Sequence, residues 1–113
     1  FMECLEIPTG GEPRALFCYV LPQKKQQFEQ YVNHHLQKYC TLHKAQELID
    51  KGYFGLFKPH PKLLSRIGDY ILILKENYAF SEHPPKKNKE LHIGNHGGVS
   101  KEEMTIPLMK VRL

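Results

Sequence analysis

The sequence predicts an α+β fold in which two helices cover one side of a small, mostly antiparallel sheet. Two runs rich in β-branched and aromatic residues, at 14–21 and 69–77, are typical of strands. Between them, apolar residues recur every three or four positions from 24 to 39, which predicts an amphipathic helix. The order of strands and helices also allows some parallel pairing, and the sequence leaves this open.

The N-terminal part contains one clear strand. Residues 1–7 fit either a short strand or the frayed end of a longer element. Residues 8–13 combine two prolines with two glycines, so a turn is expected there. The strand at 14–21 then ends at Pro22, because proline cannot donate a backbone hydrogen bond.

The helix at 24–39 carries two adjacent histidines, His34 and His35. Neighbouring helical residues point about 100° apart, so these imidazoles cannot readily share one ion. We interpret both as surface or half-buried histidines rather than metal ligands.

A brief strand at 40–43 and a second helix at 44–51 follow, and Gly52 suits the position just past the helix end. The aromatic turn at 53–57 has two interpretations. It could fill space between helix and sheet, or it could offer a stacking face to a nucleobase.

The remaining middle segment leads into the second clear strand. Residues 63–67 predict a short helix or turn, and the run at 70–74 predicts a strand buried on both faces or against a helix. Residues 81–90 are rich in proline and lysine and are expected to form a solvated loop.

The C-terminal stretch combines a glycine-rich loop with a helix start signal. Glycines at 94, 97 and 98 flank His96, and Ser100 is followed three residues later by Glu103. That spacing predicts a capping box and one helical turn through 101–104. Residues 105–111 would follow as a strand, restricted to an edge by Pro107.

Residues 93–108 read Ile-Gly-Asn-His-Gly-Gly-Val-Ser-Lys-Glu-Glu-Met-Thr-Ile-Pro-Leu. This run resembles the C-terminal signature of the type I phosphodiesterase and nucleotide pyrophosphatase family of the alkaline phosphatase superfamily. The segment from Gly11 to Arg14 is similar to the start of a strand in the same family. A helix followed by Gly-Tyr-Phe-Gly and Arg66-Ile-Gly-Asp adds a weaker similarity.

The resemblance implies hydrolysis of phosphoester or phosphoanhydride bonds at a centre of two divalent metal ions, expected to be zinc. His96 would be a metal ligand, and Asn95, Gly97 and Gly98 would help to orient it or the substrate. No catalytic residue of that family has a counterpart in this chain. The 113 residues are therefore expected to be one unit at the C-terminal end of an alkaline-phosphatase-like α/β hydrolase, and inactive alone.

Within that unit, residues 12–80 would form a cap-like α+β module and residues 91–113 would return to the catalytic domain. The expected partners are a nucleotide or other phosphoester substrate and the upstream catalytic region of the same parent chain. The formal charge of +4 favours steering of phosphate-bearing substrates, but it is too mild to predict binding of a specific nucleic acid.

The sequence predicts no membrane span, because no apolar run approaches about 20 residues. Its three cysteines form no CxxC pair and are expected to be buried thiols of a cytoplasmic protein. A competing hypothesis is a non-catalytic α+β module that binds phosphate-rich ligands through its basic loop and aromatic turn.

Overall fold

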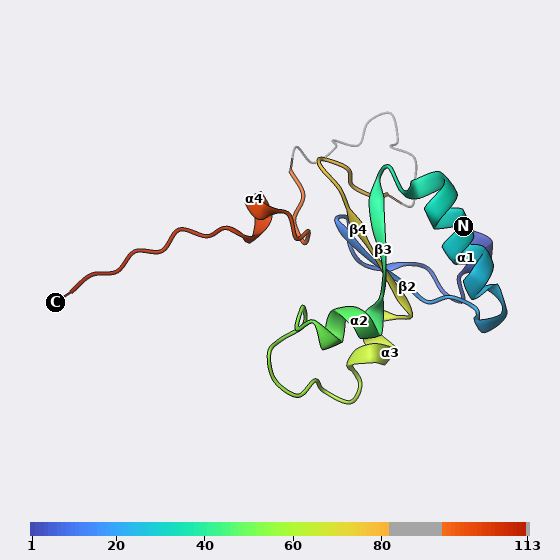
Figure 1. Cartoon of the computed structure of the whole chain (residues 1–113), viewed down its shortest axis with the longest axis horizontal. Helices are drawn as coiled ribbons and strands as arrows, with labels where there is room; N and C mark the ends of the chain where they lie inside the picture. Colours follow the sequence, from blue (N-terminus) through green and yellow to red (C-terminus); the bar gives the residue numbers. More distant parts are fainter. Residues whose placement is uncertain (82–93, 113) are drawn as a thin grey trace.

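A computed structural model describes residues 1–81 and 94–112 of the chain. It contains a four-stranded antiparallel sheet with strand order β1-β2-β4-β3, together with short helices, which confirms the α+β class (Figure 1). No parallel pair occurs among the described strands. The strands are β1 (Gly10–Glu12), β2 (Ala15–Cys18), β3 (Cys40–Lys44) and β4 (Tyr70–Leu74).

β1 and β2 form a tight hairpin, so the prediction that residues 8–13 are only a turn was wrong. Glu12 pairs with Ala15, which leaves Pro13 and Arg14 as the two-residue connection. Gly11 permits this pairing with a φ of 85°, and a Cβ there would collide with the carbonyl oxygen of Ala15. Glycine composition indicated the bend but not the strand before it.

β4 is the central strand, and both of its faces are buried. Leu72 lies between Leu16 of β2 and Leu42 of β3, and its side chain is 1% exposed. Because side chains alternate along a strand, Tyr70, Leu72 and Leu74 face one cluster and Ile71 and Ile73 face the other. The strand is five residues long, shorter than the predicted 69–77.

The helices lie on opposite faces of the sheet, so the expectation that one side carries both was wrong. On one face, α1 (Lys25–Tyr31) buries Phe28 and the next turn buries Val32. On the other face, α2 (Ala45–Asp50) and α3 (Leu63–Ile67) bury Ala45, Leu48 and Ile67. Amphipathicity shows that a helix covers a sheet, but it carries no information about which face is covered.

The region of the predicted helix at 24–39 is divided among three segments of different helix type. A 3₁₀ turn, η2 (Pro22–Lys24), leads into α1, and α1 widens into a π-helical segment, η3 (Val32–Leu36). Of the positions that this spacing placed on the buried face, Phe28 and Val32 are buried, whereas Tyr31, His35 and Tyr39 are exposed. Apolar spacing also does not specify the hydrogen-bond register. The N-terminal segment is likewise a 3₁₀ turn, η1 (Met2–Cys4), followed by a single bridge from Leu5 to Val20.

The end of α2 matches the prediction. Gly52 follows the helix with a φ of 79°. Its amide donates to the Ile49 carbonyl and the Tyr53 amide donates to the Leu48 carbonyl, which is the Schellman arrangement. Beyond it, the aromatic turn does not fill a space in the core. Leu56 is 89% and Phe57 is 92% exposed.

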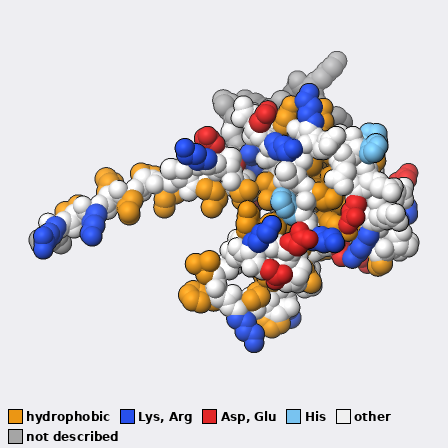
Figure 2. Space-filling model, in the orientation of Figure 1, with side chains coloured by type: hydrophobic (Ala, Val, Ile, Leu, Met, Phe, Trp, Pro, Cys, Tyr) orange, Lys and Arg blue, Asp and Glu red, His pale blue; other side chains and the backbone are white. Residues whose placement is uncertain are grey.

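The C-terminal segment begins with α4 (Lys101–Met104) and then continues as an extended tail (Figure 1). The predicted strand at 105–111 was wrong, because these residues pair with no strand of the described sheet. Figure 2 shows apolar side chains along this tail in contact with solvent. The predicted proline- and lysine-rich loop at 81–90 lies outside the described residues, apart from its first residue, Ser81.

Three features complete the fold. Cys4, Cys18 and Cys40 are buried and unpaired, as expected from the sequence. Burial raises the pKa of the Cys18 thiol to about 12. Among the described helices, none has the length and apolarity required to cross a bilayer.

Removing the side chain at the centre of β4 should strongly destabilise the chain. We expect Leu72→Ala to lower the free energy of unfolding by about 2–5 kcal/mol, because it leaves a cavity between the two layers of helices. Leu56→Ala removes the same atoms from an exposed position and should change stability by less than about 0.5 kcal/mol. Urea unfolding of both variants tests this, and similar losses would contradict the two-faced core.

Candidate functional site

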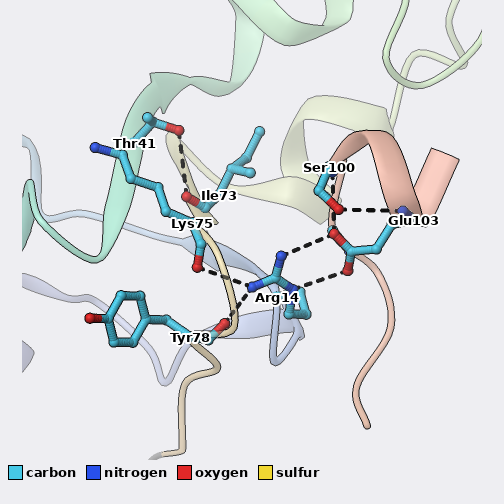
Figure 3. A network of polar contacts seen from close by, with 8 residues as sticks. Arg14, Thr41, Ile73, Lys75, Tyr78, Ser100 and Glu103 are labelled. Atoms are coloured by element: carbon cyan, nitrogen blue, oxygen red, sulfur yellow. Dashed lines mark hydrogen bonds and ion pairs between the residues drawn. The ribbon is translucent and has the colours of Figure 1, made fainter.

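Arg14 lies at the turn of the β1–β2 hairpin, and its guanidinium donates four hydrogen bonds. Arg14 is only 5% exposed. Its Nη1 atom donates to the carbonyl oxygen of Tyr78 at 2.6 Å and to that of Lys75 at 3.4 Å. Its Nε and Nη2 atoms donate to the two carboxylate oxygens of Glu103, each at 3.0 Å (Figure 3). This bidentate pair joins residues 89 positions apart.

Glu103 collects hydrogen bonds from both sides. Besides the two from Arg14, its carboxylate accepts from the backbone amides of Gly98 and Ser100, both at 3.2 Å. The Glu103 amide in turn donates to the hydroxyl oxygen of Ser100 at 3.3 Å. The predicted capping box is thereby confirmed. The same carboxylate caps α4, holds the glycine loop and contacts the hairpin.

The two glycines after His96 fit where larger residues would not. Gly97 has a φ of 92°, and a Cβ there would lie 2.7 Å from the Cβ of Glu12. A Cβ on Gly98 would overlap the carboxylate of Glu103. The Gly-Gly pair therefore allows the loop to approach the hairpin and Glu103 closely.

His96 projects away from this anchored loop. Its side chain is 85% exposed, and its Nδ1 atom lies 3.9 Å from Oε2 of Glu12. Asn95 is also exposed, whereas Gly98 is buried. The structure therefore places one imidazole at the solvent-facing edge of a loop that is fixed immediately after it.

The chemistry of this site is limited by its donor set. Within residues 1–81 and 94–112, no group of three or more histidine, cysteine, aspartate or glutamate side chains could hold a metal ion. Zinc sites normally use three or four protein ligands. The described residues therefore supply no complete ligand set of this kind around His96.

The charges of Arg14 and Glu103 explain why this pair, the anchor of the glycine loop, is strong. The pKa of Glu103 is lowered from 4.5 to about 2, mainly by the hydrogen bonds from Arg14 and also by those from Ser100, against the opposing effect of burial. Reciprocally, the hydrogen bond to Glu103 raises the pKa of Arg14. Both groups remain ionised at neutral pH, so the pair is charge-assisted as well as bidentate.

Two cavities lie apart from this network. One, of about 340 Å³, is lined by apolar and tyrosine side chains between η3, β4 and residues 78–80, and no Lys, Arg, Asp or Glu is among the described residues that line it. A second, of about 370 Å³, lies where α2 meets the aromatic turn and includes Lys51, Asp50 and Phe57. Phe54 packs edge-on against Phe17 with ring centroids 6.2 Å apart, which holds one end of that turn on the sheet.

The sequence predicted the Ser100–Glu103 cap and a glycine-rich loop around His96, but it did not identify Arg14 or Glu12 as their partners. The sequence suggested one link between them, the predicted resemblance of Gly11–Arg14 to the family that the histidine block also resembles, and that resemblance stays a prediction. The described geometry brings these two segments into contact. Comparisons with protein-family models, curated proteins and solved structures yield no match for this chain.

Loss of the Glu103 charge should release the loop that carries His96. We expect Glu103→Gln to reduce stability by about 1–3 kcal/mol, because Arg14 would lose a charged acceptor in a partly buried site. Amide hydrogen exchange at Gly98 and Ser100 should accelerate with it. Glu102→Gln removes a charge from the exposed face of the same helical turn and should change neither quantity. Equal effects from the two variants would contradict the anchoring role.

The Arg14–Glu103 pair should also make the free energy of unfolding sensitive to acid. Because the folded-state pKa of Glu103 is lowered from 4.5 to about 2, the unfolded state binds more protons in that interval. The stabilisation is therefore fully present above pH 4.5 and is lost as the pH falls towards about 2. Denaturant unfolding across this window should show a steeper decline for the unmodified chain than for Glu103→Gln.

Proposed function

We propose that the chain is the C-terminal portion of a metal-dependent phosphodiesterase or nucleotide pyrophosphatase of the alkaline phosphatase type. In this proposal His96 supplies one ligand to a centre of two divalent ions, expected to be zinc. A nucleotide or another phosphoester is the substrate. The nucleophile and the other ligands belong to the upstream catalytic region of the same parent chain.

The observation that carries the proposal is the contact between two segments that separately resemble the family. Arg14 of the first segment and Glu103 of the second form the bidentate pair. A chance resemblance in one short motif gives no reason for a second, distant motif to lie against it. The convergence supports treating both segments as parts of one site.

The position of His96 supports a role as a contributed ligand. A histidine that served only the core would be buried, whereas this imidazole is 85% exposed and is followed by Gly97, whose missing side chain permits close backbone approach. The Glu103 anchor limits the backbone freedom of the loop, so less ordering remains to be done when a ligand is bound. When bound, the ions would activate a hydroxyl nucleophile and stabilise charge on the phosphoryl oxygens.

Two further features fit the proposal. The net charge of +4 would favour the approach of a phosphate-bearing substrate. The three unpaired, buried thiols suit a reducing compartment, and we propose the cytoplasm.

A second candidate is a non-catalytic module that binds phosphate-rich ligands. The exposed aromatic turn and the neighbouring cavity of about 370 Å³, which includes Lys51 and Phe57, favour it. An aromatic face and a cation could together hold a nucleotide base and its phosphate. This candidate requires no metal and no upstream region.

The central test uses the full-length protein that contains this chain. We expect His96→Ala to lower zinc affinity and kcat by at least about 100-fold, since loss of a direct ligand should exceed the effect of losing a supporting residue. His34→Ala removes another exposed histidine and should leave both unchanged. Melting temperatures should remain alike, because an exposed imidazole contributes little to the core. Full metal content and near-normal kcat in His96→Ala would reject the assignment.

A complementary test uses the 113-residue chain alone. We expect it neither to bind zinc tightly nor to hydrolyse bis-p-nitrophenyl phosphate, because one histidine cannot retain a catalytic ion. Metal-dependent turnover by a phosphatase-free preparation would contradict this. Adenosine diphosphate binding without metal, abolished by Phe57→Ala, would instead favour the non-catalytic candidate.

A further inference from the structure

One ring nitrogen of His96, Nδ1, lies near a carboxylate. The Nδ1 atom faces Oε2 of Glu12 across 3.9 Å. This separation is within the range of an ion pair but longer than a direct hydrogen bond, so a bridging water or a small closure would complete the contact. The side chains are 85% and 51% exposed respectively, which leaves room for either.

The position of Glu12 follows from the fold and not from a chance surface contact. Glu12 is the last residue of β1 and pairs with Ala15 across the hairpin. A Cβ placed on Gly97 would lie 2.7 Å from the Cβ of Glu12, so the loop backbone at Gly97 packs directly against Glu12. Two residues further on, Arg14 fixes the same loop through Glu103 and thereby through the amide of Gly98.

A carboxylate beside one ring nitrogen determines what the other can do. If Glu12 accepts a hydrogen bond from Nδ1–H, the neutral imidazole keeps its lone pair on Nε2. Metal-binding histidines commonly use this arrangement, in which the second nitrogen donates to a carboxylate that orients the ring and increases its basicity.

We propose that Glu12 is a positioning residue for His96, holding the ring through Nδ1 so that Nε2 is the atom presented to a divalent metal ion. The metal-binding part of this inference rests on the function proposed above. The pairing of Glu12 with Nδ1 of His96 does not depend on the proposed function, and it can be measured without a metal.

The first measurement is the tautomer of the neutral His96 ring in the 113-residue chain, read from its ¹⁵N shifts. We expect the Nδ1–H form to predominate in the unmodified chain and to lose its predominance in Glu12→Ala. This variant keeps the Cβ beneath Gly97 but removes the acceptor. Glu6→Ala, which removes an exposed carboxylate from the same N-terminal segment, should leave the tautomer unchanged. An unchanged tautomer in Glu12→Ala would overturn the pairing.

The second measurement is zinc affinity of the full-length protein by competition with a chelator. We expect Glu12→Ala to weaken binding by about 10–100-fold, with Glu12→Gln intermediate because its amide oxygen still accepts a hydrogen bond. Glu6→Ala should bind normally. If His96→Ala loses zinc but Glu12→Ala does not, the positioning role fails while the proposed function stands. If His96→Ala also retains zinc, the proposed function itself fails.

Discussion

The pair formed by Arg14 and Glu103 is the interaction on which the arrangement of the polar site depends. The guanidinium occupies a position inside the fold where it also satisfies carbonyls of the segment after β4. An unpaired charge there would be costly, because burial disfavours an ion that lacks partners. Glu103 removes that cost and at the same time brings the last described helix and the glycine loop onto the sheet. One carboxylate therefore determines where the C-terminal segment meets the domain.

The hairpin that carries Arg14 is itself held by the central strand. The Leu74 amide donates to the carbonyl of Arg14, and the Phe80 amide donates to that of Pro13, so the turn is fixed by backbone as well as by side-chain contacts. β4 in turn is stable because both of its faces are covered. The exposed histidine is consequently supported through a short series of contacts that leads from the hydrophobic core to the loop. Loops that present functional groups from a rigid scaffold commonly have this organisation.

Signals that depend on nearby residues were read correctly from the sequence. The β2 and β4 runs, the end of α2 at Gly52 and the capping box at Ser100 each follow from residues within a few positions. Features that depend on distant partners were not predictable. The second covered face of the sheet, the burial of Arg14 and the approach of Glu12 to His96 require knowledge of which segments meet. Residues 105–111 had the composition of a strand, but a strand also needs a neighbour to pair with, and composition cannot supply one.

The extended tail has a consequence for handling the chain in solution. Ile106, Leu108 and Met109 are each more than three-quarters exposed, and the tail that carries them is extended outside the described sheet (Figure 1). Such a segment could template association between molecules at high concentration. Pro107 interrupts it, and Lys110 and Arg112 place positive charges beside its apolar residues. Proline and charge are among the features by which natural sequences suppress cross-β aggregation. Pro107, Lys110 and Arg112 would therefore oppose association through this tail.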